Sequence, residues 1–194
     1  NWCPRGIAVQ CRRIRLSAAI EALGNLSLYA IDKLMSEARR LAVEYRRTTG
    51  KPLPGVSGEL ANYDAARLLD LELCKDAPGG YDAIGKGARA GRRVQIKGRA
   101  IFDDRKSGQR VGQLKLDQDW DSVVLVLMDD AFEPVELYEA ERDAILEALD
   151  EGASSKRAKR GIMSVARFKA IARLVWARDE GPVEDEIWDN QGGG

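Results

Sequence analysis

Apolar residues at helical spacing predict two helices in the first part of the chain. The first apolar stripe begins at Leu28, continues to Tyr45 and ends near Gly50. A second helix is expected over residues 58–69, where Ser57 is in position to cap the first turn. Two prolines lie in the segment between these stripes, so we expect a loop there.

Helical spacing returns in the last third of the chain. One helix is expected over residues 139–149. Another is expected to begin at Val165, with Ser164 as its N-cap, and its apolar positions continue to Val175. A basic loop over residues 154–161 separates the two.

Strand patterns occupy the middle of the chain. Short strands are expected at residues 71–74, 81–84 and 135–137. Residues 92–102 alternate between apolar and polar side chains, which is typical of a strand with two different faces. Residues 122–128 are almost entirely apolar, as in a central strand that is covered on both faces.

Together these elements predict one α/β domain over residues 27–180, with a mixed central β-sheet flanked by α-helices. The 194 residues are enough for one domain with a substantial core. Residues 1–26 are expected to be poorly ordered, and residues 181–194 form an acidic, glycine-ending tail that is expected to be disordered. The longest apolar run, residues 123–128, is too short to span a bilayer, so no membrane partner is expected.

Composition excludes several kinds of chemistry. The chain has no histidine, so histidine-based nucleophile triads, general bases and metal sites are ruled out. Its three cysteines are too scattered for a disulfide framework or a zinc site. This cysteine usage fits a reducing, cytoplasmic setting. Any catalysis must therefore use carboxylates, amides, lysines or hydroxyls.

Charge is strongly segregated although the 31 basic and 31 acidic residues cancel. Residues 86–115 contain ten basic and two acidic side chains, and residues 152–177 contain seven basic and no acidic ones. Such blocks can form a local phosphate-binding surface, or they can simply be solvated. Residues 116–151 carry thirteen acidic side chains against one basic, which leaves a protein-interaction surface as a further alternative.

One constellation of polar residues points to specific chemistry. Asp82 follows a Gly-Gly-Tyr turn, and Gln95 and Lys97 share one face of the strand expected next. The Asp82 carboxylate and the Gln95 carbonyl are oxygen ligands of the kind that Mg²⁺ prefers. Lys97 could orient or deprotonate a water molecule, or stabilise charge on a phosphate oxygen. Glu59, near the start of the second helix, is an additional candidate metal ligand.

This constellation resembles the PD-(D/E)XK nuclease superfamily, and within it the Mrr-like branch in which Gln replaces the middle acid. The resemblance implies a restriction-endonuclease-like fold in α-β-β-β order and a DNA endonuclease of a restriction or defence type. It also implies that Asp82, Gln95 and Glu59 bind Mg²⁺, or alternatively Mn²⁺, and that Lys97 assists the attacking water. A homodimer is compatible with it, because many nucleases of this type cut both strands as dimers.

The Gln at position 95 leaves a second interpretation open. A neutral ligand removes one negative charge from the cation site and weakens metal binding unless another group compensates. The alternative is therefore a catalytically degenerate nuclease fold that acts as a DNA- or protein-binding module. Under either interpretation, basic residues near the site and before the last helix are candidate phosphate contacts. These are Lys86, Arg89, Arg93, Arg99, Lys156, Arg157, Lys159 and Arg160.

Overall fold

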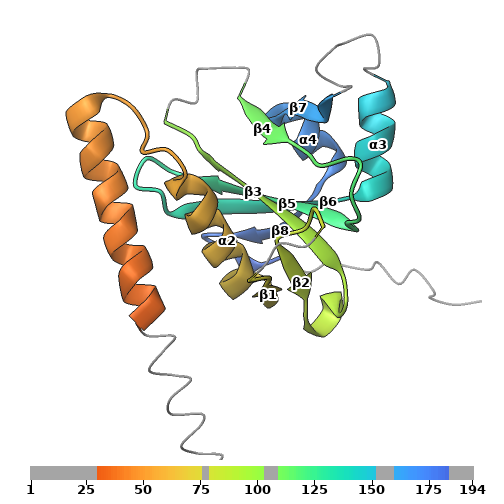
Figure 1. Cartoon of the computed structure of the whole chain (residues 1–194), viewed down its shortest axis with the longest axis horizontal. Coiled ribbons are helices and arrows are strands. Elements are labelled where there is room, and N and C mark those ends of the chain that lie inside the picture. The colour runs from red at the N-terminus through yellow and green to blue at the C-terminus, as the bar shows by residue number, and fades with distance from the viewer. Residues whose placement is uncertain (1–29, 76–78, 103–108, 152–159, 184–194) are drawn as a thin grey trace, which may run out of the picture.

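The computed structural model describes residues 30–75, 79–102, 109–151 and 160–183, and these form a mixed α/β architecture (Figure 1). A seven-stranded mixed sheet has helices on both faces, and a separate two-stranded sheet lies beside it. The mixed α/β class predicted from the apolar pattern is confirmed. No helix in the described ranges has the length and apolarity needed to cross a membrane.

The two helices expected first are both present. The first spans residues 30–49, and α2 spans Val56–Leu68. The prediction that Ser57 caps α2 is wrong. Gly55 takes the N-cap position with a φ of 84°, and no side chain caps this helix. The positive φ explains the glycine, because L-residues with a Cβ rarely adopt it.

The main sheet contains one parallel pair, which sets the positions of the polar residues on β3. β1, β2 and β3 form an antiparallel meander, and β3 then pairs in parallel with β5. β6, β8 and β9 continue the sheet with antiparallel pairing. The strands of this sheet are β1 (Leu71–Leu73), β2 (Ala83–Gly85), β3 (Arg93–Ala100), β5 (Ser122–Met128), β6 (Pro134–Glu141), β8 (Arg173–Ala177) and β9 (Gly181–Pro182).

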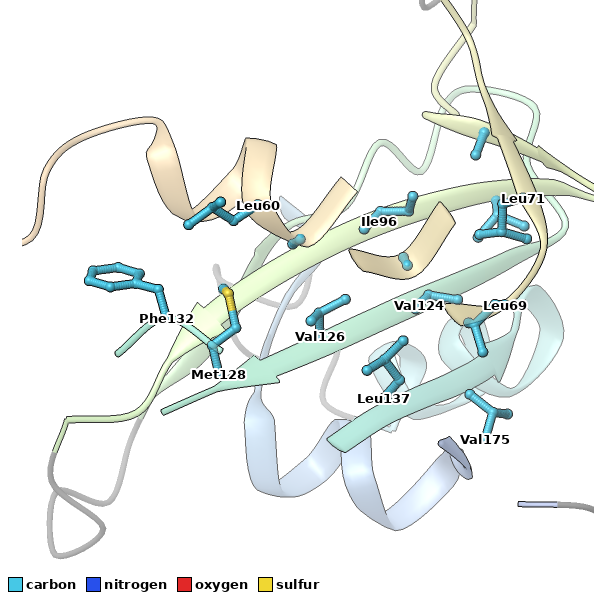
Figure 2. Close-up of a cluster of buried hydrophobic side chains, with 14 of the residues drawn as sticks. Leu60, Leu69, Leu71, Ile96, Val124, Val126, Met128, Phe132, Leu137 and Val175 are labelled. Atoms are coloured by element: carbon cyan, nitrogen blue, oxygen red, sulfur yellow. The ribbon is translucent and has the colours of Figure 1, made fainter. Parts of the chain in front are cut away.

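Two hydrophobic clusters cover the two faces of this sheet. Val124, Val126 and Met128 of β5 pack on one face with Leu60 of α2 (Figure 2), and the same cluster includes Ala42 of the helix over residues 30–49. Val123 and Leu125 point to the other face, toward the helices α3 (Arg142–Asp150) and α4 (Val165–Ile171). All seven residues of β5 are buried, so the expectation of a central strand is confirmed.

The second half of the chain differs from its predicted pattern in two places. Residues 139–141 belong to β6 rather than to a helix, because they pair with residues 122–124 of β5. Ser164 caps α4 as expected, its Oγ accepting a hydrogen bond from the backbone N–H of Arg167 at 3.1 Å. That helix ends at Ile171, however, and Val175 is a buried residue of β8.

Besides β8 and β9 of the main sheet, two short strands were not predicted. β4 (Arg110–Gln113) pairs antiparallel with β7 (Ile162–Ser164) on the face covered by α3 and α4. β4 contains one valine and a glycine, too little apolar pattern to reveal a strand. β9 also extends the sheet to Pro182, past the boundary expected at residue 180. The expectations for residues 1–26, and for the tail beyond residue 183, lie outside the described residues.

Candidate functional site

Asp82 lies just before β2, and the backbone of β3 holds its carboxylate. The backbone N–H of Asp82 donates to the carbonyl of Val94 at 2.8 Å, and the backbone N–H of Ile96 donates to Asp82 Oδ2 at 2.8 Å. A carboxylate has about four acceptor positions, so this one bond leaves capacity for a cation or a water molecule. The preceding Gly80 has a φ of 94°, and a Cβ there would lie 2.4 Å from the Cβ of Gln118.

Gln95 is completely buried and only half satisfied. Its register with Val123 puts it on the sheet face that α3 and α4 cover. Its Oε1 accepts a long hydrogen bond of 3.4 Å from the backbone N–H of Lys115, and its Nε2 has no partner among the described residues. An unpaired buried amide costs about 1–3 kcal/mol, so this group is poised to gain from a bound ligand.

Lys97 lies two residues further along β3 on the same face, in register with Leu125. Its side chain is half-buried, and this burial lowers the pKa of its ammonium group below the ordinary value. The negative charge of Asp82 raises that pKa, while the positive charges of Lys115 and Arg99 lower it. The site therefore combines one carboxylate with several cationic groups.

Lys115 is the component of this site that the sequence did not reveal. It follows β4 in the connection to β5. Its side chain is exposed, and its backbone N–H donates to Gln95 of β3. The only available signal was the alternation of polar and apolar residues at 113–116, which is equally typical of a surface strand. Its position next to Gln95 arises from a contact between residues twenty apart in sequence.

Glu59 does not join the other three residues. It is exposed on α2, whose Leu60 and Ala61 pack into the cluster on the opposite face of the sheet. Within the described part of the chain, no three acidic, cysteine or histidine side chains gather as a metal-binding group. Of the three predicted metal ligands, Asp82 and Gln95 therefore remain together, and Glu59 lies apart from them.

These two oxygen donors still fit one common type of Mg²⁺ site, in which the protein supplies few ligands. Mg²⁺ commonly binds to one or two carboxylates and completes its shell with water and substrate phosphate oxygens. The Asp82 carboxylate and the Gln95 carbonyl, which has a second lone pair beyond the Lys115 bond, meet that description. The unpaired Gln95 Nε2 is a hydrogen-bond donor, so its partner would be an acceptor oxygen of a water molecule or a phosphate and not the cation itself.

The candidate phosphate contacts around the hairpin are largely engaged within the protein. Lys86 pairs with Glu72 at 3.2 Å. Arg89 pairs with the buried Glu139 at 2.9 Å. Arg99 donates to the carbonyls of Arg110 and Gly98.

Arg93 illustrates how the segregated charges meet in the folded chain. Its guanidinium binds both oxygens of Asp121, at 2.8 and 3.1 Å, and lies 3.6 Å from Asp119. Arg93 lowers the pKa of Asp121 to about 2. The basic block thus neutralises part of the acidic block, which reduces the surface charge that either could offer to a partner.

Near the last helix, the structure describes only one of the four basic candidates. Arg160 is exposed and lines a hollow of about 200 Å³ together with Lys115 and Gln118. Lys156, Arg157 and Lys159 lie outside the described residues. Lys115 and Arg160 therefore border the same depression, although 45 residues separate them in sequence.

Neither a protein-family model nor a curated protein matches this chain.

Proposed function

We propose that this protein is a metal-dependent DNA endonuclease with a PD-(D/E)XK-type site. The observation that carries the proposal is the juxtaposition on β3 of the buried, half-satisfied Gln95 amide and the half-buried Lys97, beside the Asp82 carboxylate. A half-buried lysine and an unpaired buried amide are costly for folding alone, and such groups concentrate at functional sites. A restriction or defence role is the context that this type of site favours.

The topology supports the same class. α2 is followed by the antiparallel meander β1, β2 and β3, and the next strand of the sheet, β5, is parallel to β3. This α-β-β-β order is the one that the resemblance to restriction-endonuclease-like nucleases implies, which supports the proposal. Gly98 fits this arrangement, because a Cβ there would lie 2.4 Å from the carbonyl oxygen of Ser57 and 2.6 Å from the Cβ of Ala61. The glycine allows α2 to lie directly against the strand that carries the site.

In the proposed reaction, water attacks a phosphodiester phosphorus in line with the departing sugar oxygen. Asp82 and Gln95 would hold the Mg²⁺, which lowers the pKa of a water molecule and stabilises charge on the phosphate oxygens. The backbone N–H of Ile96 keeps the Asp82 carboxylate oriented toward this face. The Lys97 Nζ would orient the attacking water and stabilise the negative charge that develops on a non-bridging oxygen.

Cleavage of supercoiled plasmid tests the proposal. We expect nicking with Mg²⁺ or Mn²⁺ and none with EDTA. Lys97→Ala and Asp82→Ala should each lower the rate by about 100-fold or more while far-UV circular dichroism stays unchanged. Lys51→Ala, which removes an exposed lysine from the loop before α2, is the matched control and should cut like the parent.

A second candidate is a nuclease fold that binds DNA without cutting it. The single carboxylate among several cations favours it, because such a site attracts an anion more strongly than a free divalent cation. If the folded protein binds DNA in a salt-sensitive way but never nicks it, and Lys97→Ala changes only affinity, this candidate replaces the first. If metal-dependent nicking disappears in Lys97→Ala, the nuclease proposal stands.

A further inference from the structure

The connection from β4 to β5 is tied down by hydrogen bonds beside the face of β3 that carries Gln95 and Lys97. The indole Nε1–H of Trp120 donates to the carbonyl of Lys115 at 2.8 Å. Arg142 donates to the carbonyls of Leu116, Gln118 and Trp120 at 2.7–3.2 Å, and its guanidinium lies 4.6 Å from the Trp120 ring centroid. Four backbone carbonyl contacts of this kind fix the path of the loop.

This connection places the backbone of Lys115 next to Gln95. The Lys115 N–H bonds the Gln95 Oε1, and its carbonyl bonds Trp120, so its main chain is held on both sides. Its side chain, in contrast, is exposed. The fold therefore holds the backbone of Lys115 at the site and leaves its side chain accessible to solvent.

We infer that Lys115 is a second phosphate-binding residue of this site, contacting the DNA backbone next to the phosphate that Lys97 serves. This inference rests on the proposed function. A flexible lysine is suited to the role, because its ammonium group acts as a point charge with three donors and does not require one fixed geometry. Lys115 and Arg160 line the adjoining hollow together with Asp117, so two of its three charged side chains are cationic.

The positive charge of Lys115 also has a physical reason at this position. Gln95 is neutral, whereas an acid at this position would carry a negative charge. Gln95 therefore does not offset the positive charges of Lys97 and Lys115, which interact with each other. A phosphate entering the site would then meet Lys97 and Lys115 together, and it would supply the negative charge that a bound Mg²⁺ needs.

The test measures binding of a fluorescein-labelled 20-base-pair duplex to the full chain in EDTA, by fluorescence anisotropy over a range of salt concentrations. Each lost phosphate contact lowers the slope of log K against log salt by about 0.9. We expect Lys115→Ala to bind several-fold more weakly, with its slope reduced by about this amount. Lys115→Arg should retain the slope, and Lys51→Ala should match the parent.

The variant should fold normally, because the hydrogen bonds of Lys115 at this site are made by its backbone. Unchanged affinity and slope in Lys115→Ala would overturn the inference, as would a parent protein that does not bind the duplex at low salt. The proposed nuclease function is judged separately by plasmid nicking. A parent that nicks DNA while Lys115→Ala keeps the full slope refutes only the role of Lys115. A Lys115-dependent slope without any nicking refutes only the nuclease.

Discussion

Removal of the Asp64 carboxylate should strongly destabilise the protein, because it strands a buried arginine. Arg39, on the helix over residues 30–49, is 7% exposed, and Asp64 on α2 is fully buried. The Arg39 guanidinium lies 2.5 Å from Asp64 Oδ1 and donates to the carbonyl of Phe132 at 3.0 Å. It is also 3.2 Å from the half-exposed carboxylate of Glu133. This one side chain therefore ties the first helix to α2 and to the turn between β5 and β6.

The size of the effect follows from these contacts. Breaking a buried ion pair by removing one partner costs about 3–5 kcal/mol, because the remaining charge stays buried. In Asp64→Ala, Arg39 keeps the Phe132 carbonyl and Glu133, so we expect the lower end, about 3 kcal/mol. With a urea m-value of about 3 kcal/mol/M for a domain of this size, the unfolding midpoint should fall by about 1 M.

Urea unfolding followed by circular dichroism measures this change. Arg47→Ala is the control, since Arg47 belongs to the same helix and pairs with Glu44 at 3.9 Å on an exposed surface. Such a pair contributes at most about 0.5 kcal/mol. The double variant Arg39→Met, Asp64→Leu removes both charges and should recover most of the lost stability. A loss below about 1 kcal/mol in Asp64→Ala, or no recovery in the double variant, would refute this account of how the first helix is held.

Two further predictions concern the strand that carries the site and its charge environment. Gly98→Ala should force α2 away from β3 and lower the free energy of unfolding by about 1–3 kcal/mol. It should also slow plasmid nicking, because it displaces the adjacent Lys97. An unchanged unfolding midpoint in urea would contradict the close approach of α2 to β3. The pKa of Asp121 is lowered to about 2 by Arg93, so its pairing stabilises the folded state above about pH 4 and this stabilisation is lost as the pH falls toward 2. The difference in melting temperature between the parent and Asp121→Asn should therefore shrink between pH 5 and pH 2, and a constant difference would argue against this pairing.

The candidate site was only partly accessible to sequence reasoning. Strand alternation correctly gave Gln95 and Lys97 the same face, because this period follows from backbone geometry alone. Glu59 was grouped with them on the basis of chain order, but α2 packs against the other face. Lys115 was missed because its contact with Gln95 closes a loop of twenty residues, a length over which local patterns carry no information.

For the fold, the sequence alone determined the elements in which local periodicity and burial agree. The apolar run at 122–128 forms the fully buried β5, and the stripe predicted from Leu28 contains the helix over residues 30–49. Where the two signals conflict, the tertiary structure decided. Residues 139–141 have helical spacing but join β6, because pairing with β5 satisfies their backbone groups inside the sheet. Val175 also lies at helical spacing, but in the structure it belongs to β8. Local propensities are worth tenths of a kcal/mol per residue, whereas burial of a large apolar side chain contributes about 1.5–3 kcal/mol, so long-range packing prevails wherever the two disagree.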